Sequence, residues 1–162
     1  AYEISLGLVG SEMCIRDRYE NVKIVDLSSS LAEPESIDAV ITFRNLHNWL
    51  GSQADLIFSN SYKVLKSGGI LGIVEHRAKP GTSFEDMKKS GYVTEEYAIE
   101  MAEKHGFKLV SKSDINSNSK DTKDHPKGVW TLPPSFRLKE VDKEKYTEIG
   151  ESDRMTLLFK KS

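Results

Sequence analysis

The sequence predicts an α/β fold built around a pair of parallel strands, and three observations support this. Residues 39–43 and 70–74 are short apolar runs, rich in β-branched residues, that do not alternate with polar residues. Such runs are typical of parallel strands buried on both faces. A helical apolar pattern lies between the runs, and each run ends abruptly in polar side chains. We therefore predict a strand–helix–strand unit with a right-handed crossover.

The helix between the two runs has a recognisable start and end. Ser52 can cap its first turn, with Asp55 three positions further on, and Gly68 and Gly69 can end it. The residues that recur at helical spacing on one face are Ala54, Ile57, Phe58, Ser61, Val64 and Leu65. We expect this face to pack against the sheet.

The polar residues that follow the two strands define the candidate site. Ligands of open α/β sheets bind outside the carboxyl ends of the strands, and here those ends belong to neighbouring strands. The side chains expected to face a common crevice are Arg44, Asn45, His47, Glu75, His76 and Arg77.

Two stretches of the sequence resemble a known family. An Asp-x-Val strand opening at Asp38, a polar cluster with an aromatic residue, a helix and a Val-Leu-Lys-x-Gly-Gly motif at residues 64–69 resemble the fourth and fifth strands of class I S-adenosylmethionine-dependent methyltransferases. Ser67 stands where that family usually has proline. Residues 42–49 and 121–134 are similar to a family of bacterial predicted methyltransferases of unassigned substrate.

The resemblance covers about residues 20–161 and implies a Rossmann-like sheet with its third to seventh strands, the last of them antiparallel between the fifth and sixth. Residues 22–27 would be the third strand, 107–110 the sixth and 155–159 the last. The family's glycine-rich cofactor loop, and the acidic residue after its second strand, have no counterpart here. We therefore expect a truncated, carboxyl-terminal part of the domain that is inactive alone. The strand at 39–43 should have an unpaired edge.

The chain divides into two parts. Residues 1–18 resemble translated sequencing-adapter read-through and are set apart from the methyltransferase-like part, residues 19–162. Gly7 and Gly10 lack the third glycine and the following helix of a nucleotide loop. Residues 111–134 are polar and without a period, and we predict an ordered flap over the mouth of the site. An exposed mobile hairpin is the alternative.

Three further segments have local signals of their own. Thr94, followed by two glutamates, predicts a capped helix that ends at His105. Residues 142–149 can form a short helix, and residues 79–89 a loop or short helix over the crevice.

The resemblance implies S-adenosylmethionine as the cofactor. Asp26 and Leu27 would flank its adenine, and Arg44, Asn45 and Leu46 would pass along the cofactor near its methionine end. A turn-forming role for Asp26, ahead of a run of serines, is the alternative.

Methyl transfer requires an in-line attack on an already activated carbon, so the protein mainly supplies proximity, orientation and exclusion of water. Some methyl acceptors also need a base. His47, Glu75 and His76 are the candidate catalytic residues, because histidine and a partly buried glutamate can titrate near neutral pH. Supporting or capping roles are the alternative for each.

A metal site is a competing interpretation of the polar residues His47, Glu75, His76, Asp121, Asp124 and His125. No pair has the one-turn helical spacing of a zincin, and His47 and His76 follow different strands. We therefore predict no metal site, and we interpret residues 121–125 as a solvated, turn-forming run.

The composition narrows the classes of partner. The net charge is −2 and the lysines are interspersed with acids, which predicts no nucleic-acid partner. No apolar run approaches the roughly 18 residues that span a bilayer, which predicts no membrane partner. A single cysteine, Cys14, excludes an internal disulfide framework. We predict a small-molecule methyl acceptor. A nicotinamide-dependent oxidoreductase or a non-catalytic binding module on the same sheet is the alternative.

Overall fold

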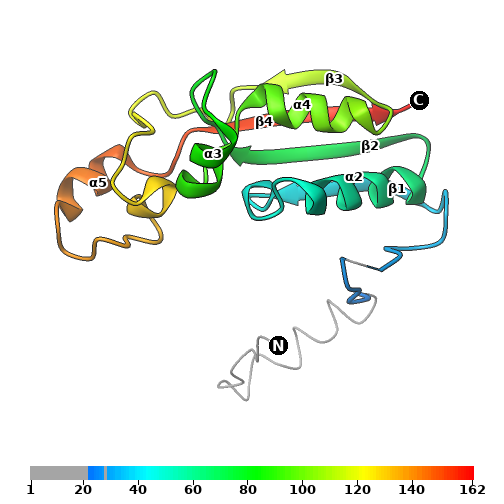
Figure 1. Ribbon diagram of the computed structural model, residues 1–162, viewed down its shortest axis with the longest axis horizontal. Coiled ribbons are helices and arrows are strands. Elements are labelled where there is room, and N and C mark those ends of the chain that lie inside the picture. Colours follow the sequence, from blue (N-terminus) through cyan, green and yellow to red (C-terminus); the bar gives the residue numbers. More distant parts are fainter. Residues whose placement is uncertain (1–21, 28) are drawn as a thin grey trace, which may run out of the picture.

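The computed structural model describes residues 22–27 and 29–162, which form one mixed four-stranded sheet. In spatial order the strands are β1 (Ile37–Phe43), β2 (Leu65–His76), β4 (Arg154–Lys161) and β3 (Phe107–Ser113). β1 and β2 are parallel, and β4 is antiparallel to both of its neighbours (Figure 1). The predicted α/β fold is confirmed, including the last strand inserted antiparallel between two earlier ones.

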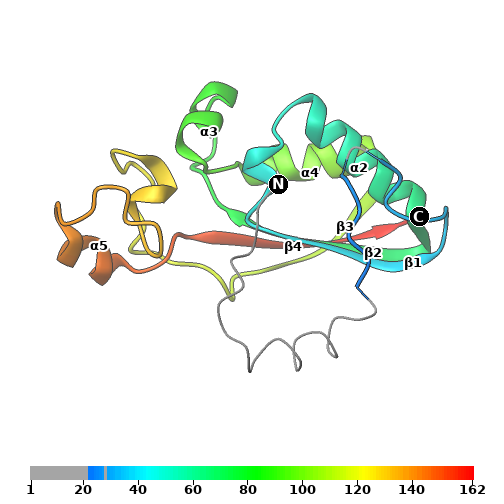
Figure 2. The ribbon, with the colours of Figure 1, turned by 90° about the horizontal axis from the view of Figure 1, so that it is seen from below.

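Two helices cover one face of this sheet. α2 (Ser52–Val64) connects β1 to β2, and α4 (Glu95–Lys104) precedes β3. Figure 2 shows both on the same side of the sheet. The shorter elements are η1 (Leu46–Asn48), α3 (Phe84–Ser90), η2 (Gly128–Thr131) and α5 (Lys143–Ile149). α3 and α5 lie beyond the carboxyl end of β2 (Figure 1).

The main core lies between the sheet and these two helices. Phe58 from α2 and Ala98 from α4 pack with Ile73, Leu157 and other buried side chains of the sheet. The opposite face of the sheet has exposed apolar residues, which are Ile41, Phe43, Ile70 and Val110. Only one face of the sheet therefore contributes to the core formed by the described residues.

β1 is an edge strand in the part of the chain that the structure describes. It pairs with β2 and with no other described strand, as the family strand order predicted. Its outer edge presents backbone groups that another strand could pair with.

The ends of α2 differ from the prediction. Gly51, and not Ser52, precedes the first turn, without a side-chain cap, and the helix ends at Val64. The chain enters β2 at Leu65, whose side chain is fully buried in the core. Gly68 has φ 78° in the irregular start of that strand. The two glycines therefore lie in a strand irregularity and not at a helix end.

The predicted strand at residues 22–27 is wrong. These residues have no strand conformation, and the side chains of Val22 and Ile24 are 60% and 97% exposed. A strand depends on hydrogen bonds to a neighbouring strand, and no described strand lies alongside this segment. The chain joins the fold further on, where the Asn60 side chain donates to the Ser29 carbonyl at 3.3 Å.

The sequence patterns that predicted the other helices were reliable. Thr94 Oγ1 accepts a hydrogen bond from the Tyr97 amide at 3.2 Å, which confirms the predicted cap of α4. The predicted short helix at α5 is present, and residues 84–90 form the short helix α3. β3 extends to Ser113, into the segment expected to be a loop. None of the helices in the described ranges combines the length and the apolar character that crossing a membrane requires.

Candidate functional site

The carboxyl ends of β1 and β2 lie side by side because the two strands are parallel. η1 follows β1 at once and carries His47 over the end of β2, where Glu75 and His76 lie. One nitrogen or carboxylate oxygen from each of these three residues lies within 4.8 Å of the others. The predicted catalytic residues are therefore neighbours in space.

Glu75 is fully buried and is held by hydrogen bonds. Its Oε1 is 3.0 Å from His47 Nδ1 and accepts the backbone N–H of His76 at 2.8 Å. Its Oε2 accepts the backbone N–H of His47 at 3.1 Å. The carboxylate therefore fixes both the turn at η1 and the ring of His47.

His76 is also buried, with 8% of its surface exposed. Its Nδ1 is 2.5 Å from the hydroxyl oxygen of Ser152, which precedes β4. Burial lowers the pKa of His76 to about 4, outweighing the opposite influence of Glu75, and the positive charges of Arg154 and Arg44 act in the same direction as burial. His76 is therefore neutral near pH 7.

A pocket of about 330 Å³ opens in front of these histidines. The rings of Trp130 and His47 are in a T-shaped contact, with 6.0 Å between the ring centroids. Arg44 and Arg154 contribute positive charge to the lining. The other lining residues are Phe43, His76, Val129, Pro133, Pro134, Ser135 and Ser152. Residues 129–135, from the predicted flap region, thus form one wall of the pocket.

A second hollow, of about 350 Å³, runs beside β1 and α2 and is mostly apolar. We call it the β1 groove, and it is lined by Leu27, Leu31, Val40, Ile41, Thr42, Phe43, Asn45, Trp49, Ile57, Phe58, Ser61 and Leu71. Among the described residues, Thr42 Oγ1 is the buried side-chain polar atom that has no hydrogen-bond partner. Phe43 lines both this groove and the histidine pocket, so the two hollows adjoin at the end of β1.

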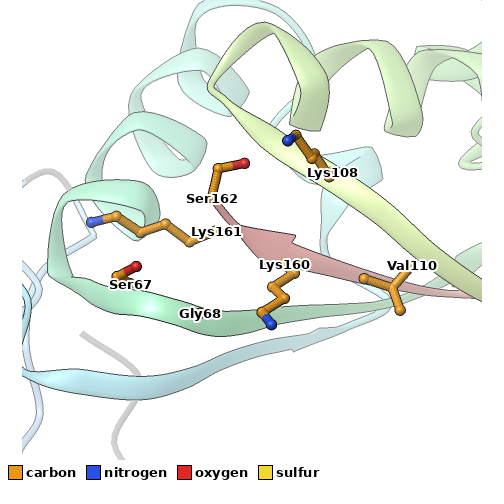
Figure 3. A pocket seen from close by; sticks show the side chains of 7 residues that line it. All are labelled: Ser67, Gly68, Lys108, Val110, Lys160, Lys161 and Ser162. Carbon is orange, nitrogen blue, oxygen red and sulfur yellow. The ribbon is translucent and has the colours of Figure 1, made fainter.

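A third hollow lies at the opposite end of the sheet, where β2 begins (Figure 3). Its lining residues are Ser67, Gly68, Lys108, Val110, Lys160, Lys161 and Ser162. The Lys161 ammonium already donates to the Leu65 carbonyl at 2.7 Å. This hollow is remote from the carboxyl ends of the parallel strands and is not the candidate site.

The structure places the predicted cofactor-binding residues in several different surroundings. Leu27 and Asn45 line the β1 groove, whereas Arg44 lines the histidine pocket. The Asp26 carbonyl accepts the Ser29 amide at 3.0 Å, as in a turn. Leu46 is 1% exposed within the core, so its side chain does not face either hollow.

Arg77 does not join the crevice, which corrects the prediction. Its guanidinium binds Asp153 at 2.9 Å and Glu95 at 3.1 Å, so it holds the start of β4 and α4 beside β2.

Residues 121–125 are solvated only in part, which is a second correction, because Thr122 and Asp124 are exposed but Asp121 is buried. Asp121 is 5% exposed and accepts hydrogen bonds from the Tyr92 hydroxyl at 3.0 Å and from His125 Nε2 at 2.9 Å. It also accepts the backbone N–H of Asp153 at 2.8 Å. Burial and the neighbouring Asp121 raise the pKa of Tyr92. Asp121 is buried within this polar run because residues from distant elements donate hydrogen bonds to its carboxylate.

Sequence reasoning missed several residues of the site. Ser152 and Arg154 lie more than 70 positions from His76 and carry no motif. Thr42 belongs to a predicted strand and to the family-like stretch 42–49, but neither indicated a role for its hydroxyl. A polar residue just before a strand that returns to the sheet was the available signal for Ser152.

The arrangement of the strands has counterparts among solved structures. The [4+2]-cyclase SpnF is 22% identical over 92% of this chain and 60% of its own, with a TM-score of 0.60. A SAM-dependent methyltransferase from Methanosarcina mazei is 12% identical over 86% of this chain and 66% of its own, with a TM-score of 0.55. The 1,6-didemethyltoxoflavin-N1-methyltransferase of Burkholderia thailandensis, solved with S-adenosylhomocysteine, is 12% identical over 93% of this chain and 56% of its own, with a TM-score of 0.55. No protein-family model and no curated protein matches the sequence.

These similarities establish the fold. The chain has the Rossmann-like fold of SAM-dependent methyltransferases. It spans 60% of the SpnF chain and 66% of the Methanosarcina chain. Because SpnF is named a cyclase, the fold by itself does not determine the reaction, and the argument for function rests on the site.

Proposed function

We propose that this chain is the carboxyl-terminal part of an S-adenosylmethionine-dependent methyltransferase that acts on a small molecule. The proposal rests on the observation that two hollows adjoin at the carboxyl end of β1. One is the apolar β1 groove and the other is the polar pocket with His47 and His76, and Phe43 belongs to both. Two molecules bound in such neighbouring sites would have their reacting atoms close together.

The β1 groove suits the implied cofactor in the chemistry of its lining. Apolar side chains such as Leu27 can flank an adenine, the Thr42 hydroxyl lacks a partner, and Asn45 offers an amide. When bound, S-adenosylmethionine supplies an electrophilic methyl group. Asp26 and Arg44 would extend the contacts at either end, and Leu46 would contribute through its backbone only. The open edge of β1 is where further strands of a longer chain would complete the groove.

The histidine pocket would hold the methyl acceptor. His47 accepts its proton, while Glu75 orients the ring and stabilises the positive charge that forms on it. His76 is neutral and available as a hydrogen-bonding group, and Trp130 supplies a flat apolar wall. Residues 129–135 limit access of water from one side.

Isothermal titration with S-adenosylhomocysteine tests the cofactor assignment. The titration compares this chain with a longer version that carries the sequence preceding it in its source. We expect binding by the longer version and little by residues 1–162, because no strand among the described residues pairs with the outer edge of β1 beside the groove. Binding by neither would contradict the proposal and favour the nicotinamide-dependent or non-catalytic alternative.

Substitution of His47 tests the catalytic assignment. In the longer version, His47→Ala should lower turnover by about 100-fold to 10,000-fold, because a positioned base contributes that much. His105→Ala is the matched control, since His105 pairs with Asp55 on α2. An unchanged turnover rate for His47→Ala, with S-adenosylhomocysteine still bound, would remove His47 from the mechanism.

A further inference from the structure

The pairing of His47 with Glu75 accounts for a base, but it does not explain why the His76 ring lies beside that pair. The two imidazole rings lie 5.3 Å apart between centroids, and both line the same pocket. Their nitrogens and a Glu75 oxygen gather within 4.8 Å of one another. Two imidazoles and one carboxylate around a shared point are a common ligand set for divalent transition metals.

The contacts around the cluster also resemble those of metal ligands. Such ligands are usually oriented by hydrogen bonds through their other polar atoms. Glu75 Oε2 accepts the backbone N–H of His47, and His76 Nδ1 lies 2.5 Å from Ser152 Oγ. When Ser152 Oγ accepts a hydrogen bond from the Nδ1–H group of His76, the lone pair on His76 Nε2 is free to bind an ion.

The distances between the ligand atoms of the three side chains are close to those in a site that holds a metal ion. With metal bonds of about 2.0–2.1 Å, the ligand atoms of a tetrahedral site lie about 3.4 Å apart. His47 Nδ1 and Glu75 Oε1 are already 3.0 Å apart. All the ligand atoms lie within 4.8 Å of one another, so no separation exceeds the tetrahedral value by more than about 1.4 Å, and a small rotation of the His47 side chain can close such a difference. The adjoining pocket leaves room for water or a substrate atom as a fourth ligand.

We propose that His47, Glu75 and His76 bind a divalent transition-metal ion of the Zn²⁺ or Co²⁺ type. Mg²⁺ and Ca²⁺ fit less well, because they prefer oxygen ligands and two of the three ligands here are nitrogens. The proposal departs from our sequence-based expectation of no metal site at these residues. It does not depend on methyl transfer. An ion held by His47 would occupy the ring that accepts the proton in the proposed function, so His47 would act as that base in the ion-free form and as a ligand in the ion-bound form.

The test is a titration of the untagged chain, residues 1–162, with Co²⁺ followed by visible absorption and with Zn²⁺ followed by calorimetry. We expect one ion per chain in both. His47→Gln and His76→Asn should each weaken binding at least tenfold, because each removes a ligand. Ser152→Ala should weaken binding about tenfold, through loss of the group that orients His76.

His105→Asn is the control, because that histidine pairs with Asp55 far from the cluster. Circular dichroism of each variant checks that it is folded, and His47→Gln, whose amide can still donate to Glu75, remains informative if another variant unfolds. Absence of binding, or binding that survives loss of His47 and His76, would overturn the proposal. No cofactor is present in these titrations, so their outcome is independent of S-adenosylhomocysteine binding.

Discussion

Asp121 illustrates how much one side chain depends on residues far from it in sequence. Its carboxylate is buried and receives hydrogen bonds from Tyr92, His125 and the amides of Lys123 and Asp153. A buried carboxylate is tolerated only when its oxygens are satisfied in this way. The same donors would be left without a partner if the carboxylate were removed.

We therefore predict that Asp121→Ala lowers the free energy of unfolding by about 3 kcal/mol or more, since several buried donors lose their acceptor. Urea denaturation of the chain measures this. Asp124→Ala is the matched control, because Asp124 is exposed and its side-chain contact is with Thr122. The control should change stability by less than about 0.5 kcal/mol. Equal effects of the two substitutions would contradict the anchoring role of Asp121.

At the scale of elements, the packing of α3 against η2 places one wall of the histidine pocket. Gly128 starts η2 with φ 56°, and a Cβ built on it would lie 2.0 Å from the Ser90 carbonyl oxygen at the end of α3. The two elements approach so closely that only glycine fits. Val129 and Trp130 follow directly and line the pocket.

Gly128→Ala should accordingly destabilise the protein by about 3 kcal/mol or more, as the sum of overpacking and the cost of a left-handed backbone. Thermal unfolding followed by circular dichroism measures the loss. Gly81→Ala separates the two causes, because Gly81 has φ 77° but no atom within 4 Å of a built Cβ. We expect about 1 kcal/mol for Gly81→Ala. If Gly128→Ala lowered the stability no more than Gly81→Ala does, the close approach of α3 and η2 would be contradicted.

On the scale of the whole molecule, Asp153 connects parts that are distant in sequence. Arg77 after β2 donates to it at 2.9 Å, Lys123 contacts it at 2.7 Å, and the Asn118 amide donates at 2.9 Å. Burial alone would raise the pKa of this carboxyl, but the hydrogen bonds from Arg77 and Lys123 outweigh it and hold the pKa well below its usual range. The ionised form is thus favoured in the folded protein.

This shift predicts a loss of stability in acid. Because the folded pKa of Asp153 lies below the unfolded value of about 3.9, its contribution is present above that pH and falls as pH decreases through the folded value. Urea midpoints measured between pH 7 and pH 3 should decrease. Asp153→Asn should be less stable at pH 7 and should show a smaller decrease. A variant with the same pH dependence as the original chain would contradict the role of Asp153.

The sequence allowed good predictions where short-range rules operate. Apolar runs predicted β1 and β2, helical spacing predicted α2, and Thr94 predicted the start of α4. Polar residues at the strand ends predicted that His47, Glu75 and His76 would meet, because parallel neighbours end at one edge. Failures came where a long-range partner decides the outcome. Residues 22–27 have strand-like composition, but no strand of the described part of the chain lies beside them. Residues 121–125 look solvated but contain a buried carboxylate.

The sequence by itself determined the order of the main elements and the kinds of side chain at the strand ends, since periodicity and local propensity are written into neighbouring residues. The tertiary structure alone decided that Ser152 holds His76, that Trp130 faces His47 and that Asp121 is buried. It also joined the β1 groove to the histidine pocket at Phe43. These features require residues brought together from separate parts of the chain, and their geometry is set by how the elements pack.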